Sequence, residues 1–338
     1  MNNQLLVNSS PHYRCGDSTA SLMRDVIIAL IPALGGAVIF FGFRSLLLTL
    51  VSVAACIAFE SLFNWVTKRK NTVGDLSAVV TGMILAFNLP VVTPYWMVII
   101  GAFFAIVVVK CLFGGLGKNF LNPALAARAF LFSWPAIMTT FTKPLSSMYH
   151  ELSFIFGEPM FVNEQNDALD AISSATALSS LKQGGQPEMG LMDLFIGNVP
   201  GCIGETSALL ILVGLVYLLC RKVITWHIPV FYVGSVALLT FLFPAGNMNN
   251  LTYMSYELLS GGLMLGAVFM ATDYTTSPLS RLGKVIYAVG CGGLTVLLRT
   301  FGDLPEAVSY SILIMNVVTL VLDRYLKPQR YGIGGAAE

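Results

Sequence analysis

The sequence has few charged residues: Asp, Glu, Lys and Arg make up 11% of its 338 residues, whereas 56% are hydrophobic. A soluble globular protein carries about 25% charged residues, so this chain has too little charge to cover a surface that faces water. Most of its perimeter is therefore expected to contact lipid. The net charge is +1 and the charges are scattered, which gives no indication of a nucleic-acid partner.

The sequence also has no CxxC pair and no histidine cluster. Most of its six cysteines fall in apolar runs, which is typical of small buried side chains and argues against an iron–sulfur cluster within this chain. The three histidines are far apart, so no metal site and no catalytic residue is predicted. Residues 1–23 have no charged segment followed by an apolar core and a cleavage site, and we interpret them as a retained cytoplasmic segment.

Long apolar stretches predict an all-α polytopic membrane protein, because 17 to 25 apolar residues suffice for a helix to span a bilayer. The third and eighth stretches are short and contain Gly or Pro. About ten spans are expected: 24–42, 45–66, 75–89, 95–114, 122–139, 200–219, 223–243, 257–272, 284–300 and 305–323.

The distribution of basic residues predicts the orientation. With the N-terminus inside, one set of loops and tails carries 13 Lys and Arg residues, and the other set carries only Arg44, Lys143, Lys182 and Arg299. Cytoplasmic loops are rich in Lys and Arg, so both termini are expected in the cytoplasm. Two five-helix units (24–139 and 200–323) then flank an extracytoplasmic loop (140–199), and 324–338 forms a cytoplasmic tail.

Residues 98–131 are similar to residues 285–315. Each has a Gly-containing apolar helix, a Phe-Gly turn, a Pro near the next helix start and a further span. Five helices per half is an odd number, so the second half would enter the membrane inverted, and inverted repeats with broken helices indicate a site near the midplane. Alternatively, the similarity is only that of two Gly-rich membrane hairpins.

Thr176 is the first candidate site residue, in the loop sequence "DALDAISSATALSSLKQGG". Small neighbours leave its hydroxyl accessible to covalent modification by a separate enzyme, and Asp170 is placed to position a cation or an incoming phosphate. The other reading is an ordinary solvated loop.

Two glycine-rich segments supply further candidates, Asn122 in "FGGLGKNFLNPALAARAF" and Glu205 in "GNVPGCIGETSALL". No strand or GK[ST] pattern accompanies them, which argues against nucleotide binding. We expect both residues to open helices whose free N–H groups face an anion or a polar ring; the alternative is that they are helix starts only. Charges in or near spans are functional candidates by default, although snorkelling or a structural role is the alternative; they include Glu60, Lys110, Arg128, Asp273 and Glu205.

Several stretches together resemble the NqrB/RnfD family of membrane subunits over about residues 20–330: "SSAT", "GGLGKNFLNPALAARAF", "GNVPGCIGETSALLILVGLVYLL" and "FMATDYTTSPLSRLGKVIYAVGCGGLTVLLRTFGDLPEAVSYSILIMN". In that family FMN is joined by a phosphoester to the Thr that closes an [ST]-G-A-T motif. The resemblance therefore implies a covalent FMN on Thr176, with Ser173, Ser174 and Ala175 completing the motif. Ser174 replaces the usual Gly, which bears on recognition by a flavin transferase. The short N-terminal segment favours the RnfD side.

The resemblance further implies a subunit of a redox-driven ion pump in a bacterial or archaeal cell membrane, inactive as an isolated chain. Its expected partners are the other subunits of an Rnf-type complex, a flavin transferase, membrane lipid and Na⁺ or H⁺. A second, noncovalent flavin such as riboflavin and ten helices in two inverted halves are also implied. Two alternatives remain: a small-solute channel of urea-transporter-like architecture without a flavin, and a structural subunit that docks others.

Overall fold

The computed structural model describes residues 18–69, 72–142, 144, 176–182, 185, 187, 189–244, 248–302 and 307–326. All the elements assigned within these ranges are helices. The first unit contains α1 (Thr19–Phe41), α2 (Phe43–Val66), η1 (Val73–Asp75), α3 (Ser77–Phe87), α4 (Tyr95–Phe103), η2 (Phe104–Cys111), α5 (Pro123–Leu131) and α6 (Pro135–Met138). After these come α9 (Ala177–Lys182), α10 (Leu191–Ile196), α11 (Ala208–Cys220), α12 (His227–Leu242), α13 (Asn250–Leu259), α14 (Leu263–Leu265), η3 (Gly266–Met270), α15 (Arg281–Phe301) and α16 (Val308–Tyr325).

Four of the described helices are long and apolar enough to cross a membrane: α1, α2, α15 and α16. Shorter apolar helices cover 77–87, 95–111, 208–220 and 227–242. A helix lies within each of the ten predicted ranges, and the expectation of an all-helical, multi-pass membrane protein is confirmed. The segments that continue α4 and α14 are π-helices, η2 and η3. π-Helices are rare in proteins, and those that occur are often found at functional sites.

Three predicted spans were wrong in their bounds. The range 122–139 is divided into α5 and α6 by a turn at residues 132–134. The range 200–219 becomes helical only at Ala208, because residues 203 and 204 donate their amides to the carbonyls of Leu89 and Phe87 at the end of α3. The range 257–272 is broken after Leu259, where Gly261 takes a positive φ of 65°. Such a backbone conformation suits glycine because glycine has no Cβ to clash.

Arg44 and Arg299 were wrongly expected in loops. Both lie within helices and are buried, at 7% and 5% exposure. The Nε of Arg44 donates to the carbonyl of Val91 at 2.9 Å. Buried cations need such partners because desolvation is costly.

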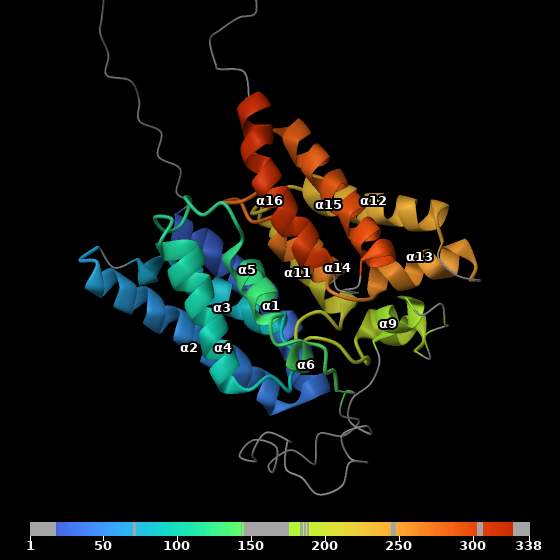
Figure 1. Ribbon diagram of the computed structural model, residues 1–338, viewed down its shortest axis with the longest axis horizontal. Helices are drawn as coiled ribbons and strands as arrows, with labels where there is room; N and C mark the ends of the chain where they lie inside the picture. Colours follow the sequence, from blue (N-terminus) through green and yellow to red (C-terminus); the bar gives the residue numbers. More distant parts are fainter. Residues whose placement is uncertain are drawn as a thin grey trace, which may run out of the picture.

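The helices form two groups joined through the centre of the molecule. Helix α2 packs on α3 and α4, and α12 packs on α15, which contacts α16. Figure 1 shows these groups on opposite sides, with α1, α5 and α11 between them. The contacts of α1 with α11 and of α5 with α16 join the groups.

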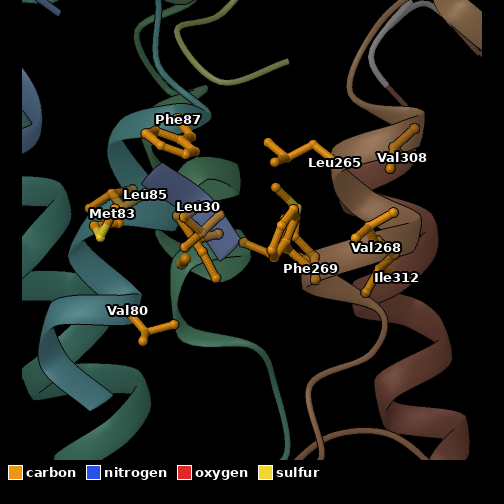
Figure 2. Close-up of a cluster of buried hydrophobic side chains, with 14 of the residues drawn as sticks. Leu30, Val80, Met83, Leu85, Phe87, Leu265, Val268, Phe269, Val308 and Ile312 are labelled. Atoms are coloured by element: carbon orange, nitrogen blue, oxygen red, sulfur yellow. The ribbon is translucent and has the colours of Figure 1, made fainter. Parts of the chain in front are cut away.

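The core lies where the short helices meet. Figure 2 shows Leu30 of α1 and Phe269 of η3 pointing toward one another, between side chains of α3 and of α16. Close backbone approach depends on glycine: a Cβ on Gly82 of α3 would lie 2.7 Å from the Cα of Val53 in α2. Small residues at helix contacts are typical of membrane bundles, where packing rather than the hydrophobic effect drives association.

Candidate functional site

Thr176 stands at the start of helix α9. Its carbonyl accepts the amides of Ser179 and Ser180, and its Oγ1 accepts the amide of Ser179 at 3.3 Å. This contact holds the hydroxyl oxygen of Thr176 at the first turn of α9. The other motif residues that the sequence analysis named, Asp170, Ser173, Ser174 and Ala175, lie outside the described residues.

Helix α9 is fixed to the second helix group. Leu178 and Leu181 are buried, and the Nζ of Lys182 donates to the carbonyl of Gly302 at the end of α15. Helix α9 also contacts α13. These contacts hold Thr176 against the membrane-spanning part of the molecule.

A small cavity of about 20 Å³ adjoins Thr176. Three segments meet there: the start of α9, the turn before α11 and the break between α13 and α14. We call this space the smaller cavity, and its lining residues are Thr176, Ala177, Leu178, Leu194, Val199, Pro200, Gly201, Glu205, Thr206, Leu259, Ser260 and Gly261.

The turn before α11 is seated on the end of α3. The amide of Gly204 donates to the carbonyl of Phe87 at 3.0 Å, and a Cβ at position 204 would lie 2.3 Å from the Cβ of Phe87. Only glycine permits this approach. Glu205 was expected to open a helix, but it lies in the turn, and Ser207 caps α11 by accepting the amide of Leu210 at 3.4 Å.

Glu205 is a buried carboxylate in the wall of the smaller cavity, at 6% exposure. Its Oε1 accepts the backbone amide of Cys202 at 3.1 Å. Its Oε2 has no hydrogen-bond partner among the described residues. A Cβ on Gly262 would lie 2.8 Å from that Oε2, so the carboxylate reaches the break between α13 and α14.

Arg128 of α5 lies behind this wall, fully buried. It donates from Nη1 to the Oδ1 of Asn88 at 2.8 Å and to the Oγ of Ser309 at 3.0 Å, and its Nη2 lies 3.7 Å from the Sγ of Cys202. Arg128 was a candidate for snorkelling, and this proved wrong, because its charge is held at the junction of α3, α5 and α16. It thus links the turn that carries Glu205 to both helix groups.

Asn122 begins α5, as the sequence predicted. Its Oδ1 accepts the amides of Ala124 and Leu125, with Pro123 in the first turn. Its Nδ2 donates to the carbonyl of Met270 at 3.3 Å. Asn122 therefore joins α5 to the end of η3, away from Thr176.

A second cavity of about 70 Å³ adjoins Asn122; we call it the larger cavity. The Oδ1 of Asn119 is buried without a partner among the described residues. Burial raises the pKa of the Asp273 carboxyl above its usual value, although hydrogen bonds from Thr275 oppose this. The polar lining residues are Ser77, Thr81, Lys110, Asn119, Asn122, Thr272, Asp273, Tyr274 and Thr275.

The two cavities lie at opposite ends of α3. Ser77 begins α3 and lines the larger cavity, whereas Phe87 ends α3 and contacts Gly204 beside the smaller one. An 11-residue helix is about 16 Å long. The larger cavity runs along α3 from Ser77 to Ile84, and the turn that lines the smaller cavity contacts the Phe87 end.

Two buried ion pairs accompany the cavities. The Nζ of Lys110 lies 2.8 Å from the Oε2 of Glu60 and also donates to the Oγ of Ser77. The pair of Arg299 and Glu257, at 2.5 Å, was missed by the sequence analysis. The sequence does show an acid and a base within apolar helices. Because 42 residues separate them, only the fold shows that they form a pair.

Comparison with known proteins gives one family and many relatives. Residues 6–332 match the model of the NQR2, RnfD, RnfE family. The chain is 45% identical over 333 residues to the D subunit of the Na⁺-translocating ferredoxin:NAD⁺ oxidoreductase complex of Acetobacterium woodii, with 97% of this chain and 96% of the relative covered. It is 37% identical over 341 residues to the D subunit of the proton-translocating ferredoxin:NAD⁺ oxidoreductase complex of Clostridium ljungdahlii, covering 98% and 97%.

A third relative is the D subunit of the ion-translocating oxidoreductase complex of Halorhodospira halophila, 34% identical over 338 residues, with 96% of this chain and 94% of the relative covered. The family resemblance expected from the sequence motifs is confirmed.

Proposed function

The chain belongs to the NQR2, RnfD, RnfE family, and on that premise we propose that it is the membrane flavoprotein subunit of an Rnf-type oxidoreductase complex that translocates ions. Three relatives are named as the D subunits of such complexes. The observation that carries the proposal is the placement of Thr176, which starts α9 and lines a small cavity together with Gly201 and Gly261. The other subunits of the complex are its partners, and the isolated chain is not expected to be active.

The proposed cofactor of the smaller cavity is FMN, joined through its phosphate to the Oγ1 of Thr176. When bound, FMN supplies one- and two-electron chemistry that protein side chains lack. Two features support attachment at this position: Thr176 lines the cavity, and the small residues Gly201 and Gly261 lie beside it. Attachment requires a flavin transferase, which reads the motif that ends at Thr176.

The larger cavity is proposed to hold the second, noncovalent flavin, such as riboflavin. Its buried Asn119 carbonyl has no partner among the described residues, and the amide of Asn122 also faces this region. Cofactor sites are commonly apolar clefts with a few placed polar groups, and this lining has that composition. The two flavins would then lie at opposite ends of α3.

The proposed topology has ten spans in two inverted halves, with both termini cytoplasmic and residues 140–199 extracytoplasmic. It is supported by the 13 basic residues assigned to the cytoplasmic side, against only Lys143 and Lys182 in the loop expected on the other side, and by the helix found in each predicted range. The outward apolar side chains suit lipid and neighbouring subunits; Trp65, Leu279 and Phe301 are 75% exposed or more.

Ion translocation is proposed to be coupled to flavin reduction, with Na⁺ or H⁺ as the ion. One relative is named Na⁺-translocating and another proton-translocating, so transport must be measured for both ions. Buried ionisable groups in membrane proteins are costly and mark ion or proton paths. The candidate groups for such coupling are two buried ion pairs: Glu60–Lys110, whose Lys110 lines the larger cavity, and Glu257–Arg299, which lines a separate pocket beside α9.

The test is intact-mass spectrometry with in-gel flavin fluorescence on the chain co-expressed with a flavin transferase. Wild type is expected to gain the mass of one FMN less one water and to fluoresce. Thr176→Ala is expected to lose both, because no hydroxyl remains to form the ester. Ser180→Ala removes a hydroxyl from the same helix and serves as the matched control that stays labelled. Unlabelled wild type with an active transferase would refute the tethered flavin, and solute-flux assays for the channel alternative would follow.

A further inference from the structure

Each helix unit carries a buried base in the last turn of the helix before its final span. Lys110 lies at the end of the helix formed by α4 and η2, and Arg299 lies in the last turn of α15. They are 2% and 5% exposed, and each is paired with a buried glutamate, Glu60 or Glu257. In the proposed topology the first pair lies toward the cytoplasm and the second toward the outside.

The base of the second unit is held rigidly. The Nη1 of Arg299 donates to the backbone carbonyl of Glu257 at 2.7 Å and to its Oε2 at 2.5 Å, and the Nη2 donates to the carbonyl of Ser260 at 3.1 Å. Two of these three acceptors are backbone atoms at the end of α13, which cannot turn away. A guanidinium also stays charged in proteins and suits paired acceptors. This ion pair is therefore a fixed part of the fold.

The base of the first unit is held by side chains alone among the described residues. The Nζ of Lys110 donates to the Oε2 of Glu60 at 2.8 Å and to the Oγ of Ser77 at 2.6 Å. Both acceptors belong to rotatable side chains, and an ammonium is a compact charge on a flexible stem. Lys110 can therefore leave Glu60 without breaking a backbone hydrogen bond.

The Glu60–Lys110 pair lies between the protein surface and the larger cavity. The other oxygen of Glu60, Oε1, accepts the hydroxyl of Thr72 at 2.6 Å, and Thr72 is exposed. On the opposite side, Lys110 and Ser77 line the larger cavity, whose volume of about 70 Å³ can admit water. A cation that moves from the surface at Thr72 to this cavity must pass the carboxylate of Glu60.

We propose that Glu60 is the carboxylate that takes up a monovalent cation, Na⁺ or H⁺, from the cytoplasmic side, and that Lys110 is its displaceable counter-ion. The inference rests on the proposed function, since it concerns the transported ion. The ammonium occupies the place beside Glu60 that the ion needs. When the ion binds, the ammonium turns toward the larger cavity, where the lining includes Asp273, so neither charge is left buried without a partner.

The surroundings leave Glu60 as the buried carboxylate next to Lys110 among the described residues. Helix α3 carries no ionisable side chain, and Arg128 of α5 is bound elsewhere. The ionisable groups near the pair on the other neighbouring segments are Cys56 of α2, Arg69, Asp75 of η1 and Cys111. Asp75 is half-buried and already accepts the amide of Ser77 at 2.8 Å.

The experiment measures the ions transported per electron transferred by the purified complex in proteoliposomes, with wild type, Lys110→Arg and Arg299→Lys. Lys110→Arg keeps the positive charge but adds donors that fix it to its acceptors, so we expect the ratio to fall at least about tenfold. Arg299→Lys makes the reverse exchange at the other pair and should stay close to wild type. Na⁺ and H⁺ uptake are measured separately, and the one that falls identifies the ion.

The outcomes separate this inference from the function on which it rests. Wild type that transports neither ion overturns the proposed function and this inference with it. Wild type that transports an ion, with the same ratio in Lys110→Arg, overturns only the role of the Glu60–Lys110 pair, as does an equal loss in Arg299→Lys.

Carbodiimide labelling of the wild-type complex covers a failure of Lys110→Arg to fold. A carbodiimide reacts with a protonated carboxyl, so it labels Glu60 when Lys110 is displaced and a proton is taken up. Peptide mass spectrometry is expected to find the label on Glu60 and not on Glu257. Na⁺ slows the labelling if Na⁺ is the ion, whereas pH alone controls it if H⁺ is the ion. A complex without label on Glu60, or with equal label on Glu257, overturns the proposal.

Discussion

The two cavities beside α3 differ in whether their charged side chains have partners within the fold. In the larger cavity the Lys110 ammonium is neutralised by Glu60 and hydrogen-bonded to Ser77. In the smaller cavity Glu205 keeps one carboxylate oxygen without a hydrogen bond among the described residues. The two cavities therefore differ in whether the fold itself completes the hydrogen bonding of their charged groups.

Substitution of the paired acid should have the largest effect on stability. Glu60→Gln leaves Lys110 as a buried charge without its counter-ion, which costs about 3–5 kcal/mol in the free energy of unfolding. Glu205→Gln keeps the bond from the Cys202 amide and should cost much less. Thermal unfolding of both variants in the same detergent measures the difference.

The control is Glu60→Gln combined with Lys110→Met, which removes both charges and should recover most of the lost stability. Equal losses in Glu60→Gln and Glu205→Gln would show that the two cavities do not differ in the way described.

Substitution of Gly204, in the turn that packs against the end of α3, should have an intermediate effect on stability. It tests whether this close contact shapes the smaller cavity. Gly204→Ala would place a Cβ 2.3 Å from the Cβ of Phe87, and such overpacking costs about 1–3 kcal/mol. Gly234→Ala in α12 meets no atom within 4 Å and should not destabilise. Chemical unfolding followed by tryptophan fluorescence compares the two, and a Gly204→Ala variant as stable as wild type would contradict the contact.

The smallest expected effect concerns the pH dependence at the larger cavity. Burial raises the pKa of Asp273 above its unfolded value of 3.8, so the folded state holds a proton that the unfolded state releases. Its contribution to stability is therefore present below the unfolded pKa and is lost as the pH rises through the folded pKa. Relative to Asp273→Asn, wild type should gain Tm as the pH falls toward about 4. A Tm difference that does not change with pH would contradict this.

The sequence predicted the helices well because they depend on local patterns, and the attachment of FMN to Thr176 stays a prediction. Apolar runs marked each helix, Asn122-Pro123 marked the start of α5, and the motif ending in Thr176 marked the loop. Local patterns could not predict the long-range contacts. Arg299 was assigned to a loop because it lies near the end of its apolar run, yet Glu257 pairs with it inside the fold.

Local patterns also could not predict the turn before α11. Apolar composition extended the predicted helix to residue 200, but the amides of this segment bond to the end of α3, more than 100 residues earlier. Glu205 was recognised as a costly charge from the sequence, whereas its unbonded oxygen and its cavity required the fold. Local patterns thus locate the candidates, and tertiary hydrogen bonds decide what each can do.

The most direct test of the central claim is peptide mapping by tandem mass spectrometry of the chain purified from membranes with its partner subunits. The account predicts one peptide that carries an FMN phosphoester, with fragment ions that assign it to Thr176. A flavin on Ser173, on Ser174 or on any other residue, or a chain with no covalent flavin in an otherwise flavin-loaded complex, would contradict it.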